Sequence, residues 1–363
     1  MSRACELAMS GQGAVEPNPP VGCVIALGDR ILAEGYHVGF GKAHAEVMAL
    51  VNVPSDARDQ LKHASLYVTL EPCCHHGKTP PCIDAILASG IGKVFTAILD
   101  PSKEVAGKGV EKLRGAGINV AVGLSEDRVR QQLGPYLKLV EKGLPWVIAK
   151  WAMTLDGKIA TRTQDSKWIS STESRAVVHE LRGRVDGIVV GIGTVLEDDP
   201  LLTARPAGQR TATRIVLDSH ARTPLDSQLG QTVDRAPTLV VVGPEASNTA
   251  TRNLEHAGVE IMHLTHPSPE GRFQMLLEEL GRRRMTNILV EGGGTVLGNL
   301  FDAGLIDEVQ VFIAPIIVGG ATAPTAIAGD GVTEMSDALN LTDVSWRTVD
   351  RDIYVRGLVA RSE

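Results

Sequence analysis

A histidine, a glutamate two residues later and a pair of spaced cysteines place the strongest constraint on this chain. His44-Ala45-Glu46 is followed by Glu71-Pro72-Cys73-Cys74 and then by Pro80-Pro81-Cys82. Zinc enzymes that remove an amine with activated water carry the related pattern H-x-E followed by P-C-x-x-C. Zinc held by three protein ligands keeps a fourth position for water and lowers the pKa of that water to about 7. The pattern therefore predicts a zinc site beside which Glu46 carries protons without being a ligand.

The cysteine spacing departs from that pattern, so the ligands have to be chosen among neighbours. Cys73 and Cys74 are adjacent, and Cys82 follows an insert that ends in two prolines. Pro81 suits a helix start, which would hold a ligand at Cys82 rigidly. We expect one zinc ion per chain, with the ligands His44, Cys73 and Cys82.

A closed site with four ligands is the alternative, with Cys74 or His75 as the additional ligand. It would leave Glu46 without a task, and we therefore favour three ligands. If Glu46 is instead structural, Glu71 is the next candidate for proton transfer.

Composition limits the class of protein. A chain of 363 residues suggests two domains. The net charge is −7 and 4% of residues are aromatic, whereas proteins that bind polynucleotides usually show a basic stripe and aromatic stacking platforms. We therefore expect a small-molecule substrate and no nucleic-acid partner. Five cysteines do not imply a disulfide framework, and Cys5 and Cys23 are expected to be buried thiols. With no apolar run of membrane-spanning length and no signal-peptide pattern, we expect no membrane partner and a cytoplasmic location.

Strand and helix signals alternate along the chain and break once. The strands predicted before the break are Val21–Ala26, Ile31–Tyr36, Ser65–Leu70, Lys93–Leu99 and Asn119–Val122. An amphipathic helix is predicted over Ser125–Lys142, and Gly143-Leu144-Pro145 then interrupts the pattern. We therefore expect an α/β protein with domains over 1–143 and 146–363.

The second half begins with an apolar strand, Trp146–Met153, and carries two strand-to-glycine-to-helix turns. The first turn lies in Gly187–Val195 and the second in Asn287–Val296. Glycines at such positions let backbone N–H groups and a helix N-terminus approach a phosphate. Neither turn has the spacing G-x-G-x-x-G, and each alone is more often a tight structural turn. Two in one domain favour nucleotide binding without identifying the nucleotide.

These motifs together resemble the bifunctional deaminase–reductase family of riboflavin biosynthesis over essentially the full length of the chain. In the first half the resemblance rests on Pro17-Asn18-Pro19, Val21-Gly22-Cys23, Gly35-Tyr36-His37, His44-Ala45-Glu46, Leu70-Glu71-Pro72-Cys73 and the string from His75 to Cys82. In the second half it rests on Lys150, Thr154-Leu155-Asp156-Gly157, Trp168-Ile169, the string from Thr194 to Thr203, Asp218-Ser219, Val290-Glu291-Gly292-Gly293, Asp307-Glu308 and Ala314-Pro315. The cysteine insert is normal in this family, in which serine is usual at the position of Cys74.

The resemblance implies two folds and two reactions. The N-terminal domain would be like cytidine deaminases, a three-layer α/β/α fold, and the C-terminal domain would be like dihydrofolate reductase, also α/β. The first reaction is zinc-dependent hydrolytic deamination of 2,5-diamino-6-(5-phosphoribosylamino)pyrimidin-4(3H)-one. The second is NADPH reduction of the ribosyl group, which gives 5-amino-6-(5-phosphoribitylamino)uracil. A homo-oligomer acting on this phosphorylated pyrimidine is expected.

The resemblance also assigns residues to each reaction. In the deaminase, Glu46 would transfer protons, and the substrate would contact Asn18, His37 and Lys78. In the reductase, Lys150 and Asp199 would lie near the ribose that is reduced. The other substrate-binding positions would be Ser166, Arg182, Leu202, Arg205 and Glu291. The NADPH positions would be Ala152, Trp168, Thr194, Asp198, Ser219 and the turn Gly293, Gly294, Thr295, Val296, Leu297, Gly298 and Asn299.

Physical arguments bear on several of these assignments. Lys150 interrupts an apolar strand, so it needs a partner or a ligand. Arginine can bind a phosphate through two parallel hydrogen bonds, which suits Arg182 and Arg205, although an exposed helix charge is the alternative for Arg182. Loop stabilisation is the alternative for the three deaminase positions Asn18, His37 and Lys78. Ser219 and Arg222 are weak candidates for the 2′-phosphate that distinguishes NADPH from NADH.

Two rival functions remain open at this point. One is a zinc deaminase acting on another base, such as adenosine in tRNA, with an unrelated second half. The other is a non-catalytic protein with a structural zinc and a nucleotide-sensing domain. Deamination of RNA would identify the first, and the absence of ammonia release would identify the second.

Overall fold

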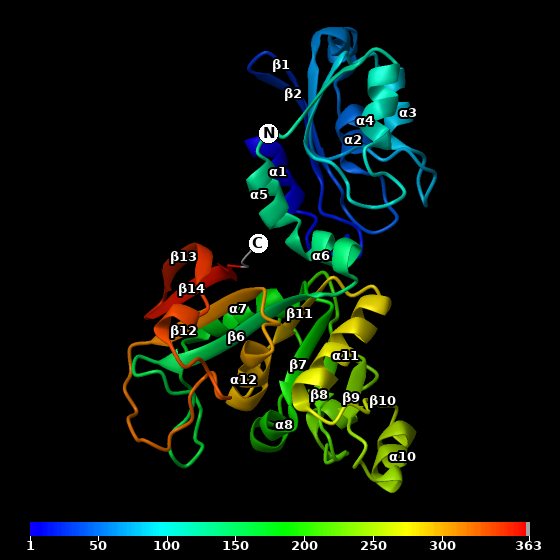
Figure 1. The fold of residues 1–363 in the computed structure, drawn as a ribbon. Helices are drawn as coiled ribbons and strands as arrows, with labels where there is room; N and C mark the ends of the chain where they lie inside the picture. Colours follow the sequence, from blue (N-terminus) through cyan, green and yellow to red (C-terminus); the bar gives the residue numbers. More distant parts are fainter. Residues whose placement is uncertain (361–363) are drawn as a thin grey trace. The chain divides into compact units, whose positions relative to one another are not determined.

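The computed structural model describes residues 1–360 and divides into two compact units. The first unit is Met1–Gly143, and the second begins at Leu144. This boundary falls inside the predicted break at Gly143-Leu144-Pro145. Each unit has its own sheet (Figure 1). Each also has its own hydrophobic core.

The first unit is built on a five-stranded sheet with the order β2-β1-β3-β4-β5. β1 pairs antiparallel with β2 and β3, whereas β3, β4 and β5 are parallel. The strands are β1 (Gly22–Leu27), β2 (Arg30–Tyr36), β3 (Ser65–Leu70), β4 (Lys93–Ile98) and β5 (Asn119–Val122). All five predicted strands are confirmed, because apolar runs bounded by turn residues define them locally.

Helices cover both faces of this sheet. They are α1 (Ser2–Met9), α2 (Ala45–Val51), α3 (Cys82–Ser89), α4 (Lys108–Gly115), α5 (Glu126–Gln132) and α6 (Gly134–Lys142), with a 3-10 helix, η1, at Ser55–His63. α2, α3 and α4 lie on one side, and α1 and α5 on the other (Figure 1). The predicted three-layer α/β/α fold is confirmed.

The single helix predicted over Ser125–Lys142 is wrong. The structure has two helices there, α5 and α6, with Leu133 between them at φ −91° and ψ 4°. Pro135 stands in the first turn of α6, where its missing N–H is harmless, but a helix continuing from α5 would lose a hydrogen bond at this position. Val129, Leu133 and Leu137 are all buried at a helical spacing, which is why the pattern looks continuous through the break.

The second unit is built on a nine-stranded sheet with the order β10-β9-β8-β7-β11-β6-β12-β14-β13. The strands from β10 to β12 are parallel, and β14 and β13 extend the sheet antiparallel. The strands are β6 (Trp146–Thr154), β7 (Gly187–Gly191), β8 (Thr213–Leu217), β9 (Thr238–Val242), β10 (Glu260–His263), β11 (Asn287–Val290), β12 (Glu308–Ala314), β13 (Leu341–Val349) and β14 (Asp352–Val359).

Hydrophobic clusters lie on both faces of this larger sheet. The helices are α7 (Thr172–Arg182), α8 (Ile192–Asp198), α9 (Gln228–Gln231), α10 (Asn248–His256), α11 (Pro269–Arg282) and α12 (Gly294–Asp302), with a 3-10 helix, η2, at Met335–Asp337. Val189 of β7 joins the cluster that contains α11 and α12, and its neighbour Val190 joins the cluster of α7, α8, α9 and α10. This alternation is that of a strand buried on both faces. The α/β architecture is confirmed, while the specific likeness to dihydrofolate reductase stays a prediction.

Both strand-to-glycine-to-helix turns are confirmed. β7 runs directly into α8, and β11 leads into α12 through Gly292 and Gly293. β7 and β11 are adjacent parallel strands, so the two turns lie at the same edge of the sheet. In open parallel sheets this carboxyl edge is where ligands bind. None of the helices within residues 1–360 has the length and apolar character needed to cross a lipid bilayer.

Candidate active sites

His44, Cys73 and Cys82 come together in the first unit as the sequence predicted. His44 Nδ1 lies 3.5 Å from the Sγ of Cys73 and 3.3 Å from the Sγ of Cys82, and all three donor atoms lie within 4.8 Å of one another. Zinc bonds to sulfur and nitrogen place tetrahedral ligands about 3.5 Å apart. The donor chemistry and spacing therefore fit a zinc site with three protein ligands.

Local structure explains how these donors are brought together. His44 is the N-cap of α2, Cys73 follows β3, and Cys82 is the first residue of α3. Pro81 lies just before α3 at ψ 135°, one residue earlier than the helical position that we expected for it, and Gly90 ends the helix at φ 76°. The backbone N–H of Cys82 donates to Cys73 Sγ at 3.3 Å, so the helix start stabilises negative charge on that sulfur.

The two thiols differ in how they hold a proton. The hydrogen bond from the Cys82 thiol lowers the pKa of Cys73 to about 4, and His44 acts in the same direction against the effect of burial. The same contact, together with burial, raises the pKa of Cys82. The hydrogen bond to Cys73 raises the pKa of His44, against the effect of burial. A metal ion would replace the shared proton, because thiolate and neutral imidazole are the ligand forms.

The four-ligand alternative finds no support, because Cys74 and His75 contact other groups. Cys74 is buried, and its thiol donates to the carbonyl of Glu104 at 3.9 Å. His75 Nε2 lies 3.2 Å from the Glu104 carboxylate. Within residues 1–360, the cluster of metal-binding side chains at this place contains neither of them.

Glu46 lies beside the triad in the position that a proton carrier needs. It is in the first turn of α2 and is 3% exposed, and its carboxyl group contacts the Cys82 thiol. Burial first, and then the negative charge on Cys73, raise the pKa of Glu46 to about 7. A carboxyl group that both holds and releases a proton near neutral pH suits general acid–base catalysis.

Glu71, the fallback candidate for proton transfer, has a structural task instead. Its two carboxylate oxygens accept hydrogen bonds from the backbone N–H groups of Asp100 at 3.1 Å, Gly107 at 2.9 Å and Val110 at 3.0 Å. The carboxylate thus ties the end of β3 to the start of α4, and its hydrogen bonds do not favour Glu71 as a proton carrier.

Asn18 and His37 form a short chain of polar groups next to His44. Asn18 Nδ2 lies 3.3 Å from His37 Nε2, and His37 Nδ1 lies 3.1 Å from the carbonyl of Ala43. The rings of His37 and His44 meet edge to face with centroids 5.1 Å apart. Burial lowers the pKa of His37, so its ring stays neutral beside the triad. Lys78 lies over the ring of Phe40 with its Nζ 3.8 Å from the centroid.

In the second unit, Lys150, Arg182 and Glu291 form a buried ionic cluster. Arg182 donates to the two carboxylate oxygens of Glu291 at 2.5 and 2.9 Å, and Lys150 Nζ lies 3.8 Å from Glu291 Oε2. Burial opposes ionisation of Glu291, but the charges of Arg182 and Lys150 prevail and lower its pKa to about 2. Burial lowers the pKa of Lys150. The exposed-charge alternative for Arg182 is wrong, since its side chain is 13% exposed.

Arg205 and Leu202 lie in the loop that follows α8, near the end of α7. Burial and then the charge of Arg182 lower the pKa of Arg205, which shows that the two guanidinium groups share one region. Leu202 is buried and has φ 53°. His179 lies one turn before Arg182 on α7, with its Nδ1 3.2 Å from the carbonyl of Thr203. Sequence reasoning missed His179, although its spacing of three residues from Arg182 places both on one helix face.

The two glycine turns face each other at the sheet edge. Gly292 and Gly293 have φ of 141° and 54°, and Thr194 Oγ1 is the atom nearest to where their side chains would begin, at 3.4 and 3.8 Å. A side chain at Gly191 would meet Val296 at 3.0 Å. The space beside Gly292 and Gly293 is therefore bounded by Thr194 and by the N-terminus of α12.

Gly294 and Gly298 have a different task. Side chains at these positions would strike the backbone of the loop after β12, at 2.6 Å from the Thr325 carbonyl and 2.2 Å from the Ala328 carbonyl. These two glycines let α12 and that loop approach closely. The loop after β12 therefore fills the space beside Gly294 and Gly298.

The remaining reductase candidates lie around the same edge. Ser166 Oγ and Lys167 Nζ each lie 3.4 Å from Asp198 Oδ1, and the exposed indole of Trp168 stacks with Arg175 at 4.5 Å. Ala152 lies in β6. Ser219 follows β8, and its carbonyl accepts from Gly243 N–H at 3.0 Å.

Asp199 and Arg222 are engaged elsewhere in the second unit. Asp199 Oδ1 accepts from the N–H of Gln228 at 2.8 Å at the start of α9, and no hydrogen bond within the described residues joins it to Lys150. Arg222 Nε lies 4.0 Å from Asp218 Oδ1.

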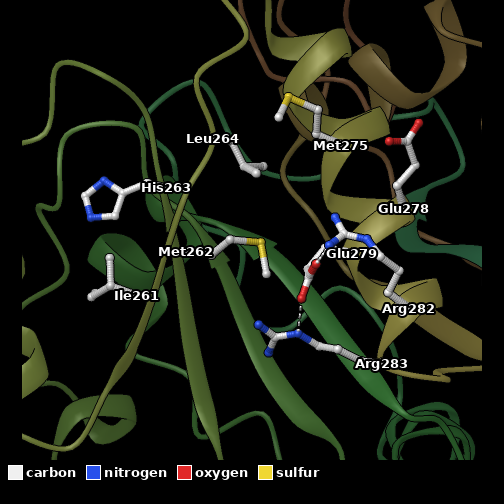
Figure 2. A pocket seen from close by; sticks show the side chains of 9 residues that line it. All are labelled: Ile261, Met262, His263, Leu264, Met275, Glu278, Glu279, Arg282 and Arg283. Carbon is white, nitrogen blue, oxygen red and sulfur yellow. Dashed lines mark hydrogen bonds and ion pairs between the residues drawn. The ribbon is translucent and has the colours of Figure 1, made fainter.

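A cavity of about 240 Å³ lies between β10 and α11 (Figure 2). Apolar Met262, Leu264 and Met275 line it together with the ion pair of Glu279 and Arg283. None of the predicted site residues lines it, so this cavity is separate from the predicted active sites.

Comparisons with known proteins match both units. The family described as the cytidine and deoxycytidylate deaminase zinc-binding region matches residues 1–98, and the RibD C-terminal domain matches residues 145–355. The riboflavin biosynthesis protein RibD of Actinobacillus pleuropneumoniae is 39% identical over 355 residues, which cover 98% of this chain and 93% of that protein. The protein of the same name from Synechocystis is 38% identical over 363 residues, with coverages of 100% and 96%.

Solved structures agree with the sequence matches. RibD of Acinetobacter baumannii has a TM-score of 0.84 at 32% identity, covering 99% of this chain and 98% of that one. The diaminohydroxyphosphoribosylaminopyrimidine deaminase/5-amino-6-(5-phosphoribosylamino)uracil reductase of Thermotoga maritima has a TM-score of 0.82 at 36% identity, with coverages of 99% and 97%. The likeness therefore extends over both units.

Proposed function

The chain belongs to the RibD family of bifunctional deaminase–reductases of riboflavin biosynthesis, and from that premise we propose which reactions it performs and with which residues. It has a zinc-binding deaminase domain and a reductase domain of the NADPH-dependent kind, and it acts on a small pyrimidine. The first reaction is hydrolytic deamination of 2,5-diamino-6-(5-phosphoribosylamino)pyrimidin-4(3H)-one. The second is reduction of the ribosyl group with NADPH to give 5-amino-6-(5-phosphoribitylamino)uracil.

The two reactions are assigned to separate parts of the chain. Residues 1–143 form the deaminase domain, and residues 146–363 form the reductase domain. The separate sheets and cores of the two units support this assignment.

In the deaminase domain, His44, Cys73 and Cys82 hold one zinc ion. Zinc bound there supplies Lewis-acid activation of water at neutral pH. Glu46 accepts a proton from the water that adds to the carbon bearing the amine, and it returns a proton to the nitrogen as the C–N bond breaks and ammonia leaves. General acid–base catalysis of this kind contributes about 10²–10⁴-fold.

The substrate of the deaminase is held by polar groups around the triad. Asn18 and His37 are hydrogen-bonded to each other beside His44, which supports a role in orienting the pyrimidine ring. Lys78 binds the phosphate as an exposed cation that reaches over Phe40. The observation that carries this half of the proposal is the burial of Glu46 against the three donor atoms.

In the reductase domain, Lys150 and Asp199 remain our candidates for the polar groups near the ribose. The contacts of Lys150 favour it, because a buried ammonium 3.8 Å from Glu291 can donate to a sugar oxygen that gains negative charge. Arg182, held by Glu291, and Arg205 bind the phosphate of the substrate. Ser166 and Leu202 complete the substrate site.

NADPH binds along the edge where the two glycine turns meet, and it supplies a hydride when bound. Thr194 and the turn of Gly293 would hold its phosphates, and the open space beside that turn supports this assignment. The further positions that we propose for contact with it are Ala152, Trp168, Asp198, Ser219, Thr295, Val296, Leu297 and Asn299. Gly294 and Gly298, also predicted as cofactor positions, face the loop after β12 instead.

We also propose a homo-oligomer in the cytoplasm, without nucleic-acid partners. β13 is the edge strand of the larger sheet, and Val344, Trp346 and Ile353 on β13 and β14 are 51%, 76% and 44% exposed. A second copy of the chain would bury these side chains. All five cysteines are free thiols, as expected in a reducing compartment.

Incubation of the purified protein with the diaminopyrimidine ribotide tests the function directly. We expect ammonia release without NADPH, and oxidation of NADPH when both are supplied. No release of ammonia would favour a structural zinc, and deamination of adenosine in tRNA instead would favour the rival deaminase.

A further inference from the structure

The C-terminal end of α7 packs tightly against residues 203–210. The N–H of Arg210 donates to the carbonyl of Gly183 at 2.9 Å, and a side chain on Gly183 would meet Gly208 at 2.7 Å. At this contact His179 Nδ1 lies 3.2 Å from the carbonyl of Thr203. A carbonyl only accepts, so Nδ1 carries the hydrogen, and Nε2 of the neutral ring is left as an acceptor.

The loop that His179 holds has a constrained backbone. Asp199 and Leu202 in this loop have φ of 42° and 53°, a region that residues with side chains rarely adopt. The N–H of Gln228 fixes one end through Asp199, and the ring of His179 fixes the other through Thr203. Such conformations persist where the surroundings over-determine them, and they gather at ligand sites.

Charged groups face His179 from each element around it. Arg182 lies on its own helix, Arg205 on the loop after α8, and Glu291 after β11. Burial lowers the pKa of His179, and the two guanidinium groups lower it further against the smaller effects of the Thr203 carbonyl and Glu291. The ring is therefore neutral at pH 7 in the free protein.

This region is prepared for an anion. Glu291 neutralises Arg182, whereas no ion pair joins Arg205 to a carboxylate within the described residues. An excess of positive charge next to a neutral imidazole can stabilise a phosphate, which carries about −1.5 to −2 charges at pH 7.

We propose that His179 is a third group that binds the substrate phosphate, beside Arg182 and Arg205, and that it takes up a proton from solvent as the phosphate binds. This inference rests on the proposed reductase function. In the complex, Nε2–H donates to a phosphate oxygen while Nδ1–H continues to hold Thr203. The ring thus couples phosphate binding to the position of the loop that carries Arg205.

NADPH oxidation with the deaminated ribotide as substrate provides the test, with KM and kcat measured across pH. The variant is His179→Asn, whose amide can keep the hydrogen bond to Thr203 but does not titrate. The matched control is His256→Asn on the exposed end of α10. We expect His179→Asn to raise KM at least about tenfold near pH 6.5, the loss of one charge-assisted hydrogen bond, with little change in kcat.

The pH profile gives a second readout with a defined sign. Bound phosphate raises the pKa of the ring, so affinity is highest while the ring is protonated in both states. KM of the parent should rise with pH through a window that begins below about 6.5 and ends at the pKa of the bound ring. His179→Asn should lose this rise and keep the titration of the substrate phosphate near pH 6, which both proteins share.

An unchanged KM with an unchanged pH profile in His179→Asn would overturn the inference while leaving the reductase intact. A fall in kcat alone would also overturn it, since that is the signature of a structural role. If tryptophan fluorescence shows that the asparagine variant is misfolded, His179→Gln replaces it, because its amide offers a donor at the Nε2 position. The KM of His179→Gln should not show the rise with pH that the parent shows. Absence of NADPH oxidation by the parent would instead reject the proposed function, and the inference with it.

Discussion

Replacing Glu291 with glutamine tests the ionic cluster of the second unit most directly. The side chains of Glu291, Arg182 and Lys150 are 6%, 13% and 15% exposed. Glutamine keeps the size of the side chain but removes its charge. Two buried cations then lose their shared carboxylate, which costs more than the loss of the hydrogen bonds alone.

The size of the effect follows from the pKa of Glu291. The carboxyl group has a pKa of about 2 in the folded protein and about 4.3 in an unfolded chain. Each pH unit of difference corresponds to about 1.36 kcal/mol, so ionisation of Glu291 contributes about 3 kcal/mol to the free energy of unfolding at pH 7. Breaking a buried ion pair typically costs about 3–5 kcal/mol, which agrees.

Tryptophan fluorescence during urea unfolding reports the free energy of unfolding of the second structural unit. The four tryptophans, Trp146, Trp151, Trp168 and Trp346, all belong to the second unit. Glu291→Gln should lower the midpoint by the equivalent of about 3 kcal/mol at pH 7. The control is Glu279→Gln, which breaks the ion pairs with Arg282 and Arg283 at the end of α11 (Figure 2) and should cost about 1 kcal/mol or less.

The pH dependence decides whether the charge is the cause. A carboxyl group whose pKa is depressed by folding stabilises the protein above its unfolded pKa, and this stabilisation is lost as the pH falls through the folded pKa. The difference in free energy of unfolding between the parent and Glu291→Gln should therefore be constant above about pH 5 and shrink to roughly half by pH 3. A difference below about 1 kcal/mol at pH 7, or one that does not change between pH 7 and pH 3, would refute the reasoning.

Three further outcomes concern the catalytic residues. Cys73→Ser and Cys82→Ser should each lose zinc, measured by metal analysis, together with ammonia release, whereas Cys74→Ser should keep both; loss of zinc in Cys74→Ser would show that the ligand set is wrong. Glu46→Gln should keep its zinc while ammonia release falls at least ~10²-fold, and survival of activity would make Glu46 structural. Lys150→Ala should still release ammonia but fail to oxidise NADPH, and mixing it with Glu46→Gln should restore the two-step conversion, followed as ribityl product; no product from the mixture would point to direct transfer between sites.

The meeting of His44, Cys73 and Cys82 was predictable because each of the three lies at a position that the local sequence defines. His44 precedes a helix, Cys73 follows a strand, and Cys82 starts a helix after a proline, so each donor has a position that short-range patterns define. The break between α5 and α6 was missed for the opposite reason. Buried residues continue at a helical spacing through Leu133, so the hydrophobic pattern predicts one helix. Only Pro135, in the first turn of α6, signals the break.

The partners of Lys150 could not be predicted from the residues around it. Arg182 and Glu291 are 109 residues apart in sequence, and they meet because β11 lies between β6 and β7 in the sheet. Strand order of this kind depends on long-range packing, which no local pattern contains. The same limit hid His179, whose hydrogen bond to Thr203 exists only because the loop after α8 folds back onto α7.

The glycines after β11 show why a motif can be both structural and functional. Gly292 and Gly293 adopt positive φ and leave open space next to Thr194, where a cofactor phosphate can approach the backbone. Gly294 and Gly298 instead allow the loop after β12 to press against α12. A side chain at either of the latter positions would force that loop and α12 apart. From the sequence alone these glycines look like one motif. In the structure, Gly292 and Gly293 border Thr194, whereas Gly294 and Gly298 border the loop after β12.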